Sequence, residues 1–399
     1  MDRRNVLKLF GALPMTWCAG SLFAAPATRP RLLVIFLRGG YDAANLLVPV
    51  SSGFYYEARP NIAIPKASGN ASDTDSNAAL ALGPDWGLHP ALRHTVYPLF
   101  TAGQAAFIPF AGTHDTSRSH FETQDSIELG QSTERGRNYR SGFLNRLAAT
   151  LAGVDAMSFT DRLPLIFQGT AQVPNTALRS IGKPAVDDRQ SRIIASMYQG
   201  TGMARQVNEG FTVRDEVMKE MIGEMDAANR NAITTKGFEL EARRIARLMK
   251  DKYNIGFVDV GGWDTHVGQG GTTGYLAGRL EELGRGLAAY AQEMGSGWRD
   301  TVVVVVSEFG RTFRENGNRG TDHGHGTVYW TLGGGIRGGR VLGEQARVEA
   351  ATLFQNRDYP VLNEYRSVFG GLFARMYGLN AGQVDRIFPD VAIRDIGIV

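Results

Sequence analysis

The chain has 399 residues, of which 43% are hydrophobic and 21% charged, and its formal net charge is +3. This composition is that of a soluble globular protein able to bury a large core. Residues 1–27 carry a local charge of +2, so the remainder is nearly neutral and has no basic stripe for nucleic acid.

The N-terminus has the features of an export signal. Residues 2–8 resemble the twin-arginine motif, and an apolar run that is short for a membrane span follows from Leu9 to Ala25. We expect a signal peptide over residues 1–27, cleaved after Ala27 or Ala25, with export to the periplasm and no stable membrane span afterwards. An uncleaved anchor is the alternative. Cys18 is the only cysteine, so the mature chain would have neither disulfides nor thiolate metal sites.

Apolar runs alternate with helical patterns along the rest of the chain. Such runs are typical of strands buried on both faces of a parallel sheet. The expected strands are 32–37, 105–110, 164–167, 255–260, 301–306 and 328–332, and the clearest expected helices are 144–152, 275–294 and 365–377. This alternation predicts an α/β fold: a doubly wound, mostly parallel sheet with helices on both faces.

Residues 28–399 are expected to form a single domain. Within it, residues 171–250 have few strand signals, and the charged helical pattern of 208–250 indicates a helical insertion or cap. The polar segment 66–78 is expected to be an exposed loop.

Acidic residues and histidines cluster where the expected strands end. The carboxyl ends of parallel strands share one edge of a sheet, where open α/β folds bind their ligands. Mixed carboxylate and imidazole groups there suit zinc, manganese or a related divalent ion, in a number that the sequence leaves open. Alternatively, the acids cap the helices that follow their strands. The candidate ligands are Asp42, Asp264, His266, Glu308, Asp322, His323 and His325.

Four of these motifs together resemble a known family. They are Phe36–Asp42, Ser117–Phe121 with Gln124 and Asp125, Gly261–His266, and Ser307–Arg311 with Thr321–Gly326. In this order they are similar to the bacterial domain of unknown function 1501, itself similar to the alkaline phosphatase and sulfatase superfamily.

The resemblance implies an alkaline phosphatase-like sheet with divalent metals at its carboxyl edge. Asp42 takes the place of the metal-binding aspartate after the first strand, and Asp264 with His266 that of a later pair. Asp322, His323 and His325 lie where the last histidine belongs. The attacking hydroxyl would be Thr116, Ser117 or Ser119. Glu308-Phe309 stands where the superfamily commonly has Asp-His, and since phenylalanine cannot bind metal, a one-metal site is as compatible as two.

The chemistry of these residue types suggests further roles. A serine at a helix start gains from the amide dipoles, which also favour an anionic substrate group. Arg118 and Arg311 could clamp two oxygens of such a group, or form structural ion pairs instead. His120 or His114 could act as a general acid or base. His89 and His94 are expected to be packing residues.

Three functions follow as hypotheses. The first is a metal-dependent hydrolase acting on an anionic phosphate or sulfate ester. The second is a non-catalytic periplasmic binding or assembly module whose partner is a second exported protein, because members of the resembled family are often encoded beside one. The third is a transferase acting on envelope glycans or lipids.

Overall fold

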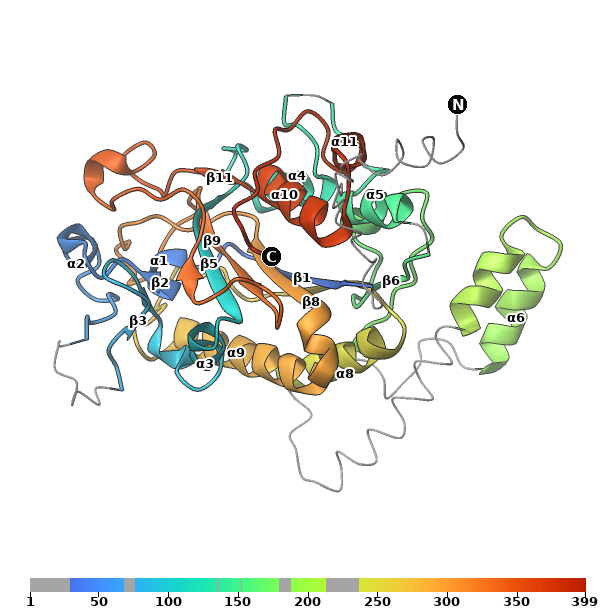
Figure 1. The fold of residues 1–399 in the computed structure, drawn as a ribbon, viewed down its shortest axis with the longest axis horizontal. Coiled ribbons are helices and arrows are strands. Elements are labelled where there is room, and N and C mark those ends of the chain that lie inside the picture. Colours follow the sequence, from blue (N-terminus) through green and yellow to red (C-terminus); the bar gives the residue numbers. More distant parts are fainter. Residues whose placement is uncertain (1–28, 68–75, 135, 152, 179–187, 213–236) are drawn as a thin grey trace, which may run out of the picture.

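The structure is a computed structural model, and it describes residues 29–67, 76–134, 136–151, 153–178, 188–212 and 237–399. The expected signal peptide lies outside the described residues. Residues 179–187 and 213–236 of the expected helical insertion also lie outside them. The described part is built around one large sheet with helices on either side (Figure 1).

The large sheet has eight strands in the order β10-β5-β9-β8-β1-β7-β6, with β11 also paired to β5. A small antiparallel sheet has the order β2-β4-β3. The strands are β1 (Arg31–Leu37), β2 (Leu47–Val48), β3 (Leu80–Ala81), β4 (Gly87–Leu88), β5 (Ala105–Gly112), β6 (Ala156–Ser158), β7 (Ile255–Val260), β8 (Thr301–Ser307), β9 (Thr327–Leu332), β10 (Arg340–Val341) and β11 (Asn363–Glu364).

Most pairings in the large sheet are parallel, as predicted. β1 lies between β7 and β8 and is parallel to both, and β6 continues the parallel order beyond β7. β9 is the exception, because it runs antiparallel to β5 and to β8.

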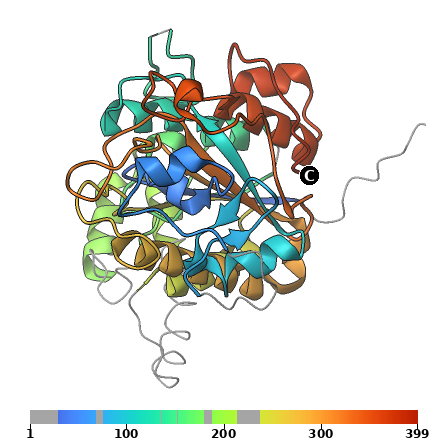
Figure 2. The same cartoon turned by 90° about the vertical axis from the view of Figure 1, so that its left-hand side faces the viewer.

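Helices cover both faces of the sheet, which confirms the predicted doubly wound α/β class. α3, α8 and α9 lie on one face, and α4, α5, α10 and α11 lie on the other (Figures 1 and 2). The helices are α1 (Ala43–Leu46), α2 (Gly53–Ala58), α3 (Val96–Thr101), α4 (His120–Leu129), α5 (Phe143–Thr150), α6 (Asp188–Tyr198), α8 (Phe238–Asp251), α9 (Tyr275–Met294), α10 (Tyr365–Tyr377) and α11 (Ala381–Ile387).

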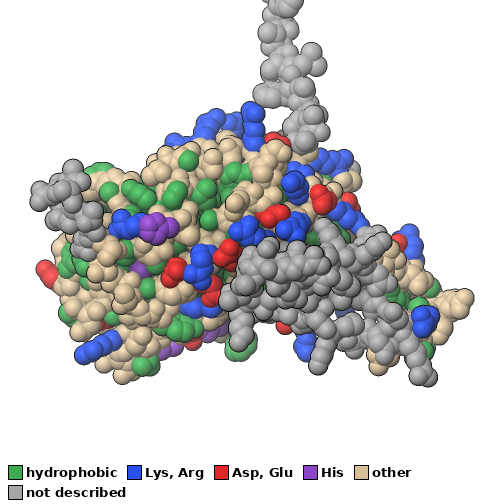
Figure 3. Space-filling view, turned by 90° about the horizontal axis from the view of Figure 1, so that it is seen from below, with side chains coloured by type: hydrophobic (Ala, Val, Ile, Leu, Met, Phe, Trp, Pro, Cys, Tyr) green, Lys and Arg blue, Asp and Glu red, His purple; other side chains and the backbone are tan. Residues whose placement is uncertain are grey.

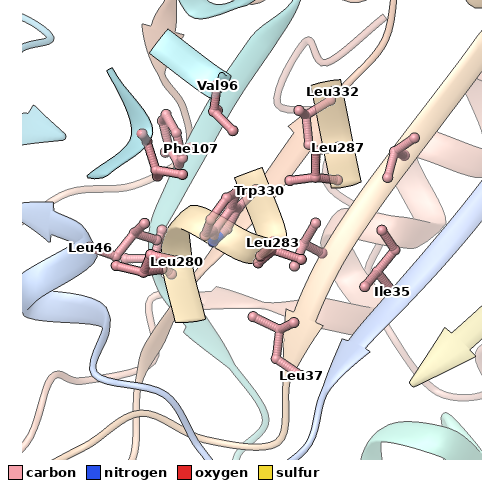
Figure 4. Packing of buried hydrophobic residues seen from close by; sticks show 14 of the residues in the cluster. Ile35, Leu37, Leu46, Val96, Phe107, Leu280, Leu283, Leu287, Trp330 and Leu332 are labelled. Carbon is pink, nitrogen blue, oxygen red and sulfur yellow. The ribbon is translucent and has the colours of Figure 1, made fainter. Parts of the chain in front are cut away.

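The core has two halves because successive residues of a strand point to opposite faces. Ile35 and Leu37 of β1 pack with Leu280 and Leu283 of α9, beside Trp330 of β9 (Figure 4). Their neighbours in β1, among them Phe36, pack in the other half. This burial on both faces explains why the central strands are continuous apolar runs.

One expected strand is wrong. Residues 164–167 do not pair in a sheet: Leu165–Phe167 form a single 3₁₀ turn after Pro164, closed by the bond from the Phe167 amide to the Pro164 carbonyl. Proline fixes φ near the helical value and so favours a turn at this point. The edge strand on this side is instead β6, whose three residues are too few to give a periodic signal.

The outer surface of α8 and α9 carries charges of both signs (Figure 3). Arg243 and Glu239 pair within α8, and Arg247 of α8 pairs with Glu293 of α9. α8, which lies in the segment expected to be an insertion, packs against α9 and helps to cover the sheet. Among the described helices, none combines the length and the apolarity that crossing a membrane would require.

Candidate metal centre

The parallel register of the central strands brings three polar segments to one edge of the sheet. Leu37 at the end of β1 lies beside Val260 of β7 and Ser307 of β8. The loops that follow these strands therefore leave the sheet together, and one of them carries Asp264 and His266. A backbone bridge between Arg311 and His323 folds the following loop back over the same place.

Three histidines converge on Asp264. The Nε2 atom of His266 lies 3.0 Å from Asp264 Oδ1 and 3.1 Å from His323 Nε2. His323 Nε2 is 3.4 Å from the same carboxylate oxygen, and His120 Nε2 is 3.6 Å from Asp264 Oδ2. His120 belongs to α4, so the cluster joins the first turn of that helix to two loops of the sheet edge.

Each of these histidines has its other ring nitrogen engaged. His120 Nδ1 lies 2.9 Å from Glu308 Oε1, and His266 Nδ1 lies 3.2 Å from Asp322 Oδ1. His323 Nδ1 lies 3.1 Å from the Arg118 carbonyl oxygen. Carboxylate and carbonyl oxygens can only accept, so each Nδ1 carries the proton. In the neutral rings the Nε2 lone pairs therefore face the cluster.

Glu308 orients the ring of His120 through the contact with its Nδ1 atom. Its side chain is fully buried, and Oε1 also accepts from the Gly39 amide and from Gln124 Nε2. Burial alone would raise the pKa of Glu308, but the bonds from His120 and Gln124 hold it below its usual value. The bond to Glu308 in turn raises the pKa of His120. Glu308, itself an expected ligand, thus contacts His120, which was expected as a general acid or base, and is not part of the cluster itself.

The arrangement fits a divalent cation. His120 Nε2 is buried and has no hydrogen-bond partner, and the Nε2 atoms of His266 and His323 lie 3.1 Å apart, while the Nδ1 of each of these two rings is engaged elsewhere. The lone pairs of two neutral rings repel one another at that separation unless a proton or a metal ion lies between them. Ligands of a tetrahedral zinc lie about 3.3 Å apart, given Zn–N distances of about 2.0–2.1 Å. The four separations given above, 3.0 to 3.6 Å, are close to this value, and ligand atoms of His120, Asp264 and His323 all lie within 4.8 Å of one another.

Arg311 holds Asp264 in this position. Its Nη1 donates to Asp264 Oδ1 at 2.5 Å, and the rest of its buried guanidinium bonds to Thr321. Partial burial would raise the pKa of Asp264, but the hydrogen bond and charge of Arg311 hold it below its usual value. Burial, together with the positive charges of Arg311 and of His120 when it is protonated, lowers the pKa of His323 and so favours its neutral ring. Arg311 is thus engaged in an internal ion pair, which favours the structural alternative over the substrate clamp for this arginine.

Two expected ligands lie outside the cluster. Asp42 is buried, and both its oxygens accept from the guanidinium of Arg59, at 2.5 and 3.0 Å. A metal on Asp42 would have to displace this cation, so the ion pair corrects the expectation. His325 is also buried, with its ring 4.8 Å from that of Phe354, and burial lowers its pKa to about 4. Asp322 contacts Nδ1 of His266, in the same way as Glu308 contacts Nδ1 of His120.

The expected nucleophiles precede α4. Ser119 is the N-cap residue, yet its hydroxyl makes no capping bond to the helix. Ser117 Oγ lies 3.3 Å from Thr123 Oγ1, and Thr116 is exposed. Arg118 pairs with the buried Asp358 at 2.7 Å, which favours the structural alternative for this arginine.

The sequence did not indicate three groups that support these residues. They are the Arg118 carbonyl, which accepts from His323; Arg59, which pairs with Asp42; and Gln269, which donates to Asp42. A main-chain acceptor has no residue-type signal, and Arg59 and Gln269 lie outside the motifs. The only hint was that Gln269 closely follows His266 in a glycine-rich stretch.

Residues 29–388 match the family described as protein of unknown function (DUF1501). No curated protein matches the chain. Several solved structures align with it at low identity. Ps i-CgsB, solved with k-i-k-neocarrahexaose, is 10% identical, with 89% of this chain and 74% of that chain covered and a TM-score of 0.37.

An alkaline phosphatase superfamily protein from Vibrio parahaemolyticus is 10% identical, with 79% and 62% covered and a TM-score of 0.33. The lipoteichoic acid synthase LtaP from Listeria monocytogenes is 8% identical, with 93% and 76% covered and a TM-score of 0.36. At such scores the resemblance is distant and carries no conclusion about the chemistry of the site.

Proposed function

The chain belongs to the DUF1501 family, and from that premise we propose that it is a metal-dependent hydrolase of a phosphate or sulfate ester. One observation carries the proposal: ligand atoms of His120, His323 and Asp264 all lie within 4.8 Å of one another, and His266 Nε2 lies 3.0 Å from Asp264 Oδ1 and 3.1 Å from His323 Nε2. Each of the three histidines is anchored through Nδ1. Anchoring of this kind is typical of metal-binding histidines.

The residues present would hold one divalent ion through His120, His266, His323 and Asp264. The carboxylates of Glu308 and Asp322 behind two of the rings add negative charge that favours a cation. When bound, such an ion polarises an ester oxygen and lowers the pKa of a coordinated hydroxyl or water. Zinc or manganese suits this donor set.

We assign the binding of the anionic substrate group and the attacking hydroxyl to α4 and its N-cap residue. The N-terminus of this ten-residue helix presents amide N–H groups that favour an anionic substrate group. Ser119 lies directly before the ligand His120, and its hydroxyl is not used as a cap. We therefore place the attacking hydroxyl at Ser119 in preference to Ser117, whose Oγ is shared with Thr123.

Metal content and turnover test the proposal together. Purified protein is expected to hold a divalent ion by elemental mass spectrometry, and to hydrolyse at least one ester in a panel of phosphate mono- and diesters and sulfate esters. His120→Ala and His323→Ala should lose both properties, while His94→Ala, at an exposed histidine outside the cluster, should keep them. A wild type without metal, or variants that retain it, would refute the proposal.

A binding or assembly module is the second candidate. It is favoured by one observation: both arginines that could clamp substrate oxygens are engaged in internal ion pairs. Under this proposal the protein binds its ion but turns over no ester, and a second exported protein co-purifies with it. Loss of that partner in His323→Ala would place the ion in the binding surface.

Transfer to a glycan or lipid acceptor would instead appear as a transfer product without free phosphate or sulfate.

Export is also a proposal. Arg3 and Arg4 lie in the twin-arginine motif of the sequence. Replacing both by lysine should leave the protein in the cytoplasmic fraction with its leader uncleaved, whereas the wild type should be recovered from the periplasm in shortened form.

A further inference from the structure

A buried side chain that is hydrogen-bonded to none of the four proposed metal ligands connects the two loops that carry three of them. Gln269 is fully buried. Its Oε1 accepts from the hydroxyl of Thr265 at 2.9 Å and from that of Thr321 at 3.1 Å. Thr265 lies between Asp264 and His266, and Thr321 lies two residues before His323. One amide oxygen therefore joins both ligand-bearing loops.

The other end of the same amide fixes the loops to the sheet. Gln269 Nε2 donates to Asp42 Oδ2 at 2.6 Å, and Asp42 is itself held by the guanidinium of Arg59. A carboxylate only accepts, so the amide nitrogen must face Asp42 and the amide oxygen must face the two threonines. The orientation of Gln269 is thus determined by its partners, and all of its hydrogen-bonding partners named here are buried.

The network continues to a metal ligand. Thr321, besides donating to Gln269, bonds through its Oγ1 and its carbonyl oxygen to the Arg311 guanidinium, which holds Asp264 Oδ1. The order Arg59, Asp42, Gln269, Thr321, Arg311 and Asp264 is a continuous path of hydrogen bonds between side chains that are buried up to its last member. Arg311 donates to Oδ1 of Asp264, and Oδ2 of Asp264 lies 3.6 Å from His120 Nε2.

We propose that Gln269 is a positioning residue of the metal centre. It holds the loops 264–269 and 321–323 in register, so that His266, His323 and Asp264 keep the spacing that a single ion requires. Asp42 and Arg59 provide the fixed end of this support. The inference rests on the proposed function, because it concerns how this chain places its own ligands around the ion.

Metal affinity is the direct test. Gln269→Leu removes both ends of the amide while keeping a side chain of similar size. It should weaken zinc binding by about 10- to 100-fold, the usual effect of removing a group that supports a metal ligand, measured by competition with a chromogenic chelator. Gln269→Glu keeps acceptors for the threonines but sets a carboxylate against Asp42, and it should also lose affinity. Ester turnover should fall at limiting zinc and recover at saturating zinc.

A matched control separates positioning from plain loss of stability. Asn145 is an equally buried amide, bonded to the carbonyls of Phe167 and Ala171 in the opposite half of the core. Asn145→Ala should lower the melting temperature of the metal-free protein without changing its zinc affinity. Thr321→Val combined with Gln269→Leu should cost less affinity than the sum of the two single changes, since both remove the bond between Thr321 and Gln269.

The outcomes distinguish the two proposals. If the wild type binds zinc, His323→Ala abolishes binding and Gln269→Leu binds as tightly as the wild type, the positioning role is wrong and the metal centre stands. If Asn145→Ala weakens binding as much as Gln269→Leu does, the effect is one of general stability and the positioning role is again wrong. If the wild type binds no zinc or other divalent ion, both proposals fall.

Discussion

His120 illustrates how a single residue is prepared for metal binding. Its Nδ1 is bonded to a buried carboxylate, and its Nε2 is buried without a partner on the side of Asp264 and His323. Phe309 lies against the ring, with 4.9 Å between the ring centroids, and so limits its rotation. Phe309 cannot bind a metal, but it contributes to the site by packing against a residue that can.

Glu308→Gln is the sharpest test of this preparation. The amide keeps an acceptor for His120 but removes the charge, so the pKa of His120 should fall and metal affinity should drop by roughly tenfold. Chelator competition and an NMR titration of the metal-free protein would measure the two effects. Glu308→Ala should in addition destabilise the fold, because donors such as the Gly39 amide lose their acceptor at about 1–3 kcal/mol each. An unchanged His120 pKa in Glu308→Gln would contradict the assigned role.

Arg118 combines a left-handed backbone with a buried ion pair. Its φ is +52°, its carbonyl accepts from His323, and its guanidinium binds Asp358. Arg118→Ala should lose the ion pair and keep the strain, whereas Arg118→Gly relieves the strain. We therefore expect the glycine variant to be the more stable of the two by about 1 kcal/mol in chemical denaturation. An alanine variant as stable as the glycine variant would show that the left-handed conformation is not maintained without the arginine side chain.

At the scale of elements, α9 contains three glycines, and two of them, Gly278 and Gly286, lie in different surroundings. A Cβ on Gly286 would overlap the ring of Phe238, the first residue of α8, whereas a Cβ on Gly278 would meet nothing within 4 Å. Close contact between α8 and α9 therefore depends on Gly286. Both positions lie inside the same helix, so they form a matched pair.

Gly286→Ala should destabilise the protein by about 1–3 kcal/mol through overpacking. Gly278→Ala should stabilise it by roughly 0.5–1 kcal/mol, because alanine is the better helix former. Denaturation midpoints of the two variants should therefore shift in opposite directions. Shifts of the same sign would mean that α8 moves to accommodate the new methyl group.

The elements that could be predicted from sequence are those whose burial leaves a long pattern. The valine run of β8 and the three- and four-residue spacing of leucines in α9 are such patterns, and both elements formed close to the expected bounds. β6 could not be predicted, since three residues show no periodicity. The prediction of a strand over residues 164–167 was wrong because an apolar triplet after proline is compatible with a turn as well as with a strand.

At the scale of the whole molecule, the convergence of strand ends was predictable but the direction of each side chain was not. Parallel topology places Asp42, Asp264 and Glu308 at one edge whatever their roles. Only tertiary contacts decide that Arg59 pairs with Asp42, that Glu308 lies behind His120, and that His325 packs against Phe354. Arg59 is distant in sequence from every motif and carries no pattern of its own.

His89 connects the stability of the whole molecule to pH. It is fully buried; its Nδ1 accepts from the Ala91 amide at 3.1 Å, and its Nε2 bonds to the Gly271 carbonyl at 3.1 Å. It thereby joins the turn after β4 to the loop that contains Gln269. Burial lowers its pKa to about 4, whereas a histidine in an unfolded chain titrates near 6.5.

Because the folded-state pKa is the lower one, the contribution of His89 to stability is complete above about pH 6.5 and declines as the pH falls towards 4. Over that interval the unfolded chain binds a proton that the folded chain rejects, which costs up to about 1.4 kcal/mol per pH unit. His89→Gln should therefore be less stable than the wild type at pH 7.5 but lose less stability on acidification. His94→Gln, at an exposed histidine, should follow the wild type at every pH. Melting temperatures of the three metal-free proteins from pH 7.5 to 4.5 would measure this, and parallel curves for His89→Gln and the wild type would exclude His89 as a source of acid sensitivity.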